Sequence, residues 1–309
     1  MSETILASIL AATLAAGTPL ALAALGELVT EKSGVLNLGT EGTMAVGAIA
    51  GFAAAWHSGS TVVGALAGIA AGAAMALLFA FLALTLAANQ VASGLALSIF
   101  GVGLAAFAGR RYESATLPVA ARLRIPGLAD LPAAGALFDA QWPVYASWLA
   151  YAAIVAFLYR SRAGLALRAI GESPQAAHAI GYPVLRIRYA ATLFGGAMAG
   201  FAGSFLSVFH TPLWSEGLVS GRGWIALALV VFATWRPARV LVGAYLFGGV
   251  MIAQLFVQGS GWRVEVPSQL LSALPYAATI VVLVAISRNP AAIRLHSPAS
   301  LGKPCRPGA

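Results

Sequence analysis

The chain has 309 residues, of which 60% are hydrophobic and only 9% are charged, whereas soluble domains carry about 25% charged residues. This composition excludes a soluble protein and predicts one that crosses a membrane several times. The net charge of +8 does not indicate nucleic-acid binding, because the basic residues lie almost entirely between apolar runs, where they set topology. The lone cysteine, Cys305, lies in the terminal tail, which excludes disulfides, thiol catalysis and cysteine-based metal sites.

Nine apolar runs predict an all-α polytopic protein with about nine transmembrane helices, since about 20 apolar residues cross the hydrocarbon core. No basic residue precedes the first run, so we interpret it as a span and not as a cleaved signal. The second and seventh runs are short, which predicts half-helices that enter from irregular backbone. Frequent glycine and alanine predict closely packed helices. The runs are Thr4–Leu25, Thr43–Trp56, Thr61–Ala88, Val91–Ala108, Pro143–Tyr159, Tyr189–Phe209, Trp224–Trp235, Val240–Gln258 and Gln269–Ser287.

Basic residues orient these spans. With nine spans, the segment Arg160–Arg188, the pair Arg236 and Arg239, and the basic tail all fall on one side. That side is predicted to be cytoplasmic, which places the N-terminus outside and the C-terminus inside. We expect residues 1–288 to form the membrane domain and residues 289–309 to form a disordered cytoplasmic tail.

One basic segment opposes this orientation. Four arginines fall outside, within the expected external loop 109–142, and three acids compensate part of their charge. The arginines are Arg110, Arg111, Arg122 and Arg124, and the acids are Glu113, Asp130 and Asp139. Two interpretations stay open: a longer external loop, to which the charge rule applies less strictly, or an error in the number of spans.

The loop of residues 160–188, between the fifth and sixth runs, carries five arginines against one acid, Glu172. Ser173 and Pro174 are typical of a helix N-cap and a first helical residue, so they separate two short predicted helices. Gly181 is expected to end the second of them. Two capped helices between membrane spans indicate a docking surface. The alternative is a cytoplasmic loop that only satisfies the charge rule.

Two polar segments share a pattern, and each opens a short apolar helix. Residues 31–42 end in Glu41-Gly42, and residues 216–223 end in Arg222-Gly223. By the predicted topology, the first segment opens from the cytoplasmic side and the second from outside. This pattern predicts an inverted repeat in which spans one to four correspond to spans six to nine. Interrupted helices in such repeats mark transport paths. Because only a few positions match, a chance similarity is the alternative.

Polar residues beside these interruptions are candidates for lining a path, because irregular backbone at membrane depth is tolerated only where it is buried in protein or lines a wet cavity. The candidates are Asn37, Thr40, Glu41, Asn89, Gln90, Glu216 and Arg222. Structural alternatives stay open for most of them. Asn89 and Gln90 would only cap the fourth span. The negative charge of Glu41 would only interact favourably with the dipole of its own helix. Glu216 and Arg222 would pair in an external salt bridge.

The sequence carries no catalytic constellation. Its four histidines are scattered over loop positions without the spacing of metal ligands, and the nearest pair, His210 with Glu216, is disfavoured as a metal site. An ATP-binding loop ending in Lys-Ser or Lys-Thr and a nucleophile elbow are both missing. We therefore expect no enzyme activity, no metal and no bound cofactor in this chain.

Four blocks in the same order resemble bacterial ABC-importer permeases that serve branched-chain amino acids, simple sugars and nucleosides. They are Ser33–Gly42, Asn89–Leu97, Arg168–Ala177 with Gly181, and Gly221–Ala228. The last block is most similar to the nucleoside (basic membrane lipoprotein-linked) permeases. The resemblance covers the chain from about Gly17 to Ser287, while the tail after Pro290 matches nothing. His178 and Trp224 depart from the pattern, which weakens the assignment of a substrate.

The resemblance implies a permease subunit of the bacterial inner membrane. Its expected partners are cytoplasmic ATPase subunits that use ATP, a second permease that is expected to be a paralogue, and an external solute-binding protein. The expected solute is a nucleoside, with branched-chain amino acids or sugars as alternatives. The resemblance makes the basic loop the coupling loop to the ATPase, through Arg168, Glu172, Ala176, Ala177 and Gly181. Arg110, Arg111, Arg122 and Arg124 are candidates for docking the binding protein.

An ion-coupled secondary transporter is the alternative from another class, because inverted repeats and broken helices suit it equally. Such a transporter needs ionisable residues buried at mid-membrane. The predicted spans hold essentially none at their centres, which favours an externally powered machine. A membrane enzyme lacks a catalytic set, and a channel would leave the docking loop unexplained.

Overall fold

The computed structural model describes residues 2–131, 134–259, 277, 284 and 296–303, and these residues are mostly helical. The α-helices are α1 (Ser2–Lys32), α2 (Thr40–Ser58), α3 (Thr61–Ala80), α4 (Gln90–Gly109), α5 (Trp142–Arg160), α6 (Arg162–Glu172), α7 (Pro174–Ala179), α8 (Val184–Ser204), α9 (Arg222–Phe232) and α10 (Pro237–Gly259). Two π-helical segments, η1 (Phe81–Thr85) and η4 (Phe205–His210), extend α3 and α8. The 3-10 turn η2 (Arg110–Tyr112) precedes the strand β1 (Arg122–Arg124), and the 3-10 turn η3 (Ala134–Phe138) lies between β1 and its antiparallel partner β2 (Asp139–Gln141).

Among the described residues, six helices are long and apolar enough to cross a membrane: α1, α3 with η1, α4, α5, α8 with η4, and α10. The predicted second span corresponds to α2, which at 19 residues is longer than the expected half-helix but is not one of the six. The predicted seventh span corresponds to α9, which is short as expected, at 11 residues. Almost all of the ninth run, Gln269–Ser287, lies outside the described residues. A multi-pass helical protein is therefore confirmed, and nine spans stay a prediction.

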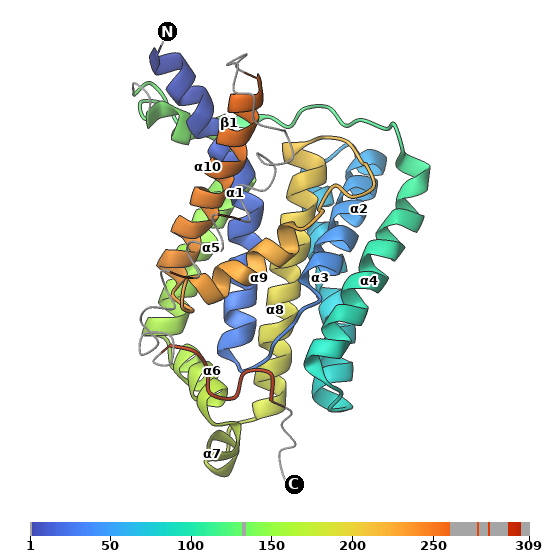
Figure 1. Ribbon diagram of the computed structural model, residues 1–309, viewed down its shortest axis with the longest axis vertical. Coiled ribbons are helices and arrows are strands. Elements are labelled where there is room, and N and C mark those ends of the chain that lie inside the picture. The colour runs from blue at the N-terminus through green and yellow to red at the C-terminus, as the bar shows by residue number, and fades with distance from the viewer. Residues whose placement is uncertain (1, 132–133, 260–276, 278–283, 285–295, 304–309) are drawn as a thin grey trace.

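Helices α1 and α8 form the centre of the bundle. Of the apolar stretch in each, 83% is buried for α8 and 67% for α1, against 28% for α4 and 22% for α10. In Figure 1, α2, α3 and α4 lie on one side of this pair, and α5 and α10 lie on the other. The peripheral helices expose large apolar side chains such as Ile99, Phe107 and Leu149. An apolar outer surface of this kind suits lipid and not water.

Glycines let α8 approach its neighbours at backbone distance. A methyl group at Gly200 of α8 would overlap the carbonyl oxygen of Gly68 and the backbone of Gly72 in α3. A methyl group at Gly47 of α2 would in turn overlap the backbone of Gly200. Without a hydrophobic drive between helices in lipid, such close contacts supply the packing energy. The predicted tight packing is confirmed at this triple contact of α2, α3 and α8.

Gly200→Ala is expected to destabilise the purified protein by about 1–3 kcal/mol, because the backbones of α8 and α3 must separate to admit the methyl group. The measurement is the midpoint of thermal unfolding in detergent. Gly103→Ala is the matched control, since a methyl group at Gly103 of α4 would meet no atom within 4 Å, and alanine is the better helix former. Equal midpoints for the two variants would contradict this account of the packing.

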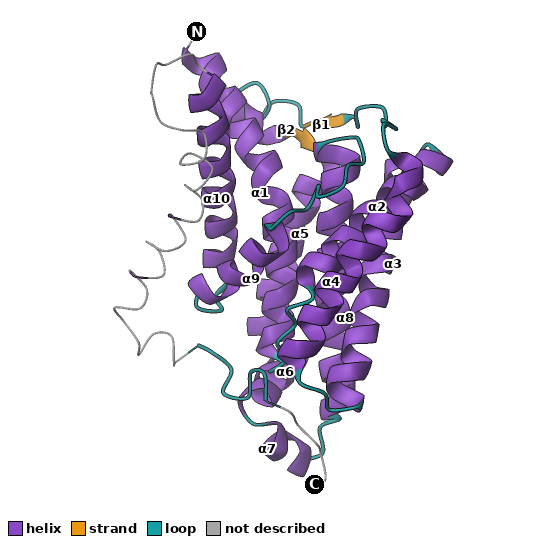
Figure 2. Cartoon of the chain, turned by 45° about the vertical axis from the view of Figure 1, so that its right-hand side comes forward, coloured by secondary structure: helices purple, strands orange, loops and turns teal. Residues whose placement is uncertain are grey.

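The two ends of the bundle differ. Helices α6 and α7 lie at one end together with the described part of the tail, and β1 and β2 lie at the other (Figures 1 and 2). Residues 296–303 of the tail form turns against the bundle, with Ser300 only 5% exposed. This part of the tail therefore differs from the expected disorder. The reason is a set of hydrogen bonds to four helices that the composition of the tail does not reveal.

Candidate functional site

The two polar segments singled out in the sequence meet inside the bundle. Residues 33–39 rise from the end of α1 to the start of α2, while the segment before α9 descends from the opposite end (Figure 1). At their meeting point, the carboxylate of Glu41 in the first turn of α2 accepts hydrogen bonds from the backbone N–H groups of Gly221 and Gly223, both at 2.7 Å. A side chain of α2 therefore caps the N-terminus of α9.

Local sequence explains why this junction closes so tightly. Gly221 is the N-cap of α9 and has a φ of 82°, a conformation that glycine adopts without strain. A methyl group at Gly223 would lie 2.5 Å from Cα of Glu41. The Glu41 side chain and the Gly223 amide that it binds are buried, and the Gly221 amide is half-buried. Hydrogen bonds between an ionised acid and N–H groups at a helix N-terminus are among the stronger ones in proteins.

A second buried acid, Glu27 of α1, holds the segment that leads into α2. One oxygen of its carboxylate accepts from the backbone N–H of Asn37 at 3.3 Å, and the other accepts from the Thr40 hydroxyl at 3.4 Å. The Asn37 side chain accepts from the N–H of Gly39 at 2.9 Å and so closes the turn before α2. Glu27, Asn37 and Thr40 are each 2% exposed. We call Glu27, Asn37, Thr40, Glu41 and the Gly221–Gly223 amides the polar junction.

A third buried acid lies one turn further along α1. Glu31 is 1% exposed and accepts a hydrogen bond from the indole N–H of Trp235, which follows α9. Thr234 and Trp235 both adopt positive φ values, 50° and 51°. This is an uncommon conformation for residues other than glycine, and surrounding contacts must hold it. Both ends of α9 are therefore tied to acids of the first two helices.

Of the predicted path residues, the structure brings Asn37, Thr40 and Glu41 together, with Arg222 between the two glycines that bind Glu41, and it separates Asn89, Gln90 and Glu216 from them. Asn89 is exposed, and its side chain caps α4 by accepting from the N–H of Ala92 at 3.0 Å, which is the structural alternative stated for it. Gln90 is buried but binds Leu36 and Lys303 near the tail. Glu216 is exposed in the segment before α9.

The expected salt bridge between Glu216 and Arg222 is not formed. Arg222 donates instead to the carbonyl oxygen of Leu218, one turn earlier in its own segment. The ion pairs seen in the described part of the chain join Arg122 to Asp139 and Arg124 to Asp130. A local backbone carbonyl, and not the exposed acid, thus accepts a hydrogen bond from the Arg222 guanidinium.

Sequence reasoning missed Glu27, Glu31 and Trp235 as buried partners, and it placed Arg188, a buried arginine of α8, at the end of the basic loop. Glu27, Glu31 and Arg188 lie beyond the predicted spans, in the last two turns of α1 and the first two turns of α8, whereas the expectation concerned the span centres. The sequence did carry a signal for the two acids, because Glu27 and Glu31 continue the helical spacing of α1. The first span was ended at Leu25, where lipid-facing hydropathy stops, although a helix covered by protein does not need to stop there.

The basic loop contains two helices, α6 and α7, as predicted. Ser173 caps α7 through its hydroxyl, which accepts from the N–H of Ala176, and Gly181 follows with a φ of 91°. Glu172, Ala176 and Gly181 are exposed, whereas Ala177 is buried against Ile170 and Val184. Arg168 lies 5.3 Å from the ring centre of Tyr159. Ala177 thus holds the two helices together, and Ala176 and Glu172 face outward.

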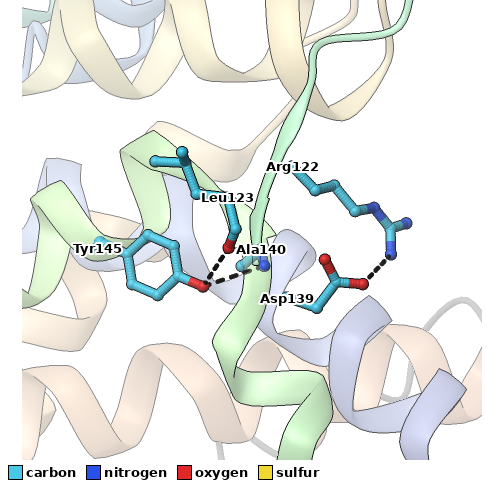
Figure 3. Close-up of polar contacts among 5 residues, drawn as sticks. All are labelled: Arg122, Leu123, Asp139, Ala140 and Tyr145. Carbon is cyan, nitrogen blue, oxygen red and sulfur yellow. Dashed lines mark hydrogen bonds and ion pairs between the residues drawn. The ribbon is translucent and has the colours of Figure 1, made fainter. Parts of the chain in front are cut away.

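Two of the arginines predicted to lie outside, Arg122 and Arg124, are part of a small surface built on β1 and β2. In Figure 3, β1 and β2 lie side by side, Arg122 reaches Asp139, and the Tyr145 hydroxyl donates to the carbonyl of Leu123 and accepts from the N–H of Ala140. These last two bonds measure 3.0 and 3.2 Å. Arg110 and Arg111 are exposed at the end of α4. The acids named in the sequence therefore do compensate two of the four arginines.

The histidines do not assemble a metal site in the described residues, where no group of three or more potential ligands is close enough. His57 contacts the Tyr112 hydroxyl at 3.0 Å. His296 lies near three cations of the end that carries α6. Burial, and then the positive charges of Arg236, Lys32 and Arg239, lower the pKa of His296. This environment disfavours the protonated imidazole.

Comparisons with known proteins show which family and relatives this chain is similar to. A family profile described as "Branched-chain amino acid transport system / permease component" matches residues 9–284. The chain is 41% identical to the putative glucose ABC transporter permease protein TsgC13 of Haloferax volcanii, over 96% of each chain. It is 32% identical to the guanosine ABC transporter permease protein NupQ of Bacillus subtilis, over 90% of this chain and 92% of that one. It is 30% identical to the nucleoside ABC transporter permease protein NupC of Lactococcus lactis, over 86% and 88%.

Proposed function

Because this chain belongs to the family of branched-chain amino acid transport system permease components, we propose that it forms the membrane path of an importer for nucleosides. Membership makes it the permease component of an ABC transporter. It is a multi-pass membrane protein and not an enzyme, since a separate ATPase subunit hydrolyses ATP. It works with ATPase and substrate-binding partners.

The observation that carries a gating role is the Glu41 contact. Two helices that are entered from opposite ends meet at their N-termini, and one buried carboxylate joins them. Interrupted helices that present their N-termini inside the membrane domain are the common device of transport paths. The bonds of Glu27 to Asn37 and Thr40, at 3.3 and 3.4 Å, are longer than the usual range and exchange readily with other partners. The polar junction is closed in this conformation and opens when α2 and α9 separate.

The chemistry of the polar junction favours a neutral solute rich in hydroxyl groups. Carboxylate, amide and hydroxyl groups pair well with sugar hydroxyls, and the positive ends of two helices are already neutralised by Glu41. The names of two relatives specify guanosine or nucleosides. A sugar is the second candidate, because the relative with 41% identity is named for glucose. Branched-chain amino acids, with their charged groups and apolar side chains, fit less well.

We propose docking surfaces for the other subunits at the two ends of the bundle. We assign ATPase docking to the exposed α6–α7 surface, through Arg168, Glu172, Ala176 and Gly181, with Ala177 as the internal support of this surface. That end is then cytoplasmic, with the N-terminus outside and the membrane domain spanning residues 1–288. The external arginines Arg110, Arg111, Arg122 and Arg124 are the proposed docking surface of the binding protein. A second permease, a paralogue, completes the path, and ATP binds only to the ATPase subunits.

The test is solute uptake by the complex that co-purifies with a tagged copy of this chain, reconstituted in liposomes with its binding protein. We expect ATP-dependent uptake of labelled guanosine, reduced by excess unlabelled adenosine and unaffected by leucine. ATP-dependent uptake of glucose without guanosine would replace the nucleoside by a sugar. Guanosine uptake that needs an ion gradient and no ATP would overturn the mechanism.

A further inference from the structure

The described part of the C-terminal tail, residues 296–303, binds four separate helices at the end that carries α6 and α7. The backbone N–H and the hydroxyl of Ser300 both donate to the carbonyl oxygen of Gly171 near the end of α6, at 3.0 and 2.6 Å. The same hydroxyl accepts from the Arg188 guanidinium of α8 at 3.1 Å. Lys32, the last residue of α1, donates to the carbonyl of His296 at 2.8 Å.

The same turn also holds the segment that leads into the polar junction. Arg188 donates from its other side to the carbonyl of Ser33 at 3.0 Å, and the N–H of Gly302 donates to the carbonyl of Gly34 at 3.3 Å. Gln90 of α4 accepts from the N–H of Leu36 at 2.8 Å and donates to the carbonyl of Lys303 at 3.4 Å. Hydrogen bonds therefore connect Gly171 to the segment 33–36 through Ser300, Gly302 and Lys303.

Two glycines make room for this arrangement. A side chain at Gly34, whose φ is 86°, would overlap the Ser300 hydroxyl and lie 2.7 Å from the Arg188 guanidinium. A side chain at Gly171 would overlap the carbonyl oxygen of Lys32 and lie 3.3 Å from Pro298. Arg188 and Ser300 are 2% and 5% exposed, so water competes little for their hydrogen bonds. The described tail residues are thus packed as part of the domain, and their contacts require glycine at positions 34 and 171.

We propose that residues 298–303 form a strap that transmits movement of the α6–α7 surface to the segment 33–39 and hence to the polar junction. A displacement of α6 pulls Gly171 and, through Ser300, moves Arg188 and Gly34. The segment 33–39 then shifts Asn37 and Thr40 against Glu27. This inference rests on the proposed function, because the displacement is supplied by the ATPase. Ser300, Arg188 and Gln90 are positioning residues, since they act through the segment and do not contact solute.

The first arm of the test needs no partner. Hydrogen exchange of the purified chain is compared for wild type, Ser300→Ala and Ala299→Ser, an exposed neighbour in the same turn. We expect amides of residues 33–39 and of residues 168–173 both to exchange at least tenfold faster in Ser300→Ala, with no change in the control. Gln90→Leu, which cuts the other end of the strap, should accelerate only residues 33–39. Faster exchange confined to residues 168–173 in Ser300→Ala, or no change, overturns the strap.

The second arm uses the reconstituted complex and measures solute moved per ATP hydrolysed. In Ser300→Ala we expect this ratio to fall at least threefold while ATP hydrolysis continues. A purely structural role would lower uptake and hydrolysis together and leave the ratio unchanged, which overturns the transmission role. Failure of the wild type to transport any solute with ATP would instead overturn the proposed function, and the exchange measurement would still judge the strap.

Discussion

Glu41→Gln is expected to reduce ATP-driven uptake more than tenfold and to lower the thermal stability of the chain. The carboxylate accepts one hydrogen bond on each oxygen, from Gly221 and Gly223. An amide offers one oxygen and turns its NH₂ group towards the second N–H, so one buried donor loses its acceptor. Such a loss costs about 1–3 kcal/mol, and the charge that answers the dipole of α9 is lost as well. Uptake and the unfolding midpoint in detergent measure the two effects.

Glu216→Gln is the matched control for this substitution. It removes the same charge from an exposed position just before α9, where surface changes cost at most about 0.5 kcal/mol. We expect wild-type uptake and stability for this control. If Glu41→Gln also transports at the wild-type rate, the polar junction is not part of the path or its gate, whatever its effect on stability.

Gly181→Pro is expected to abolish ATP-driven uptake while the chain still inserts and folds. Gly181 has a φ of 91° and donates its N–H to the carbonyl of His178 at 2.9 Å. Proline has no N–H and fixes φ near −65°, so the turn that ends α7 cannot form and the exposed face of α7 is displaced. A methyl group there would meet no atom within 4 Å, so the bundle itself is not disturbed. Uptake and binding-protein-stimulated ATP hydrolysis are the measurements.

Gly181→Asn provides the control at the same position, because asparagine keeps the N–H and tolerates the left-handed conformation. It should transport as the wild type does. Glu172→Arg, which reverses an exposed charge at the end of α6, should behave like the proline variant if this surface docks on the ATPase. Wild-type uptake in both Gly181→Pro and Glu172→Arg would remove the coupling role from the loop.

The local features of this chain were predictable, and the long-range contacts were not. Ser173 and Pro174 mark the start of α7 by rules that concern one helical turn, and the structure follows them. The signature ending in Glu41-Gly42 indicated a helix start in the same way. That its carboxylate binds amides 180 and 182 residues later is a property of the packed bundle. Neither periodicity nor composition encodes which two helix ends will meet.

Hydropathy also predicted the wrong end for the first span, because protein replaces lipid as the surroundings of the last turns of α1. Helix α1 continues past Leu25 because Glu27 and Glu31 find N–H and O–H donors inside the bundle. These acids lie near the end of α1 and not at the span centres to which the argument against a secondary transporter referred. The family match and not the charge pattern excludes that class.

The Glu41 contact also has a consequence for the order in which the protein is made. Ribosomes add about 5–20 residues per second, so Gly221 is synthesised roughly 10–35 seconds after Glu41. During that interval the first helices are inserted while the acid has no α9 to bind. The half-made protein must keep this carboxylate hydrated or protonated, and α9 completes the first half as well as the second when it arrives. Biogenesis is therefore the stage at which a defect at Gly221 or Gly223 would be felt by helices made long before.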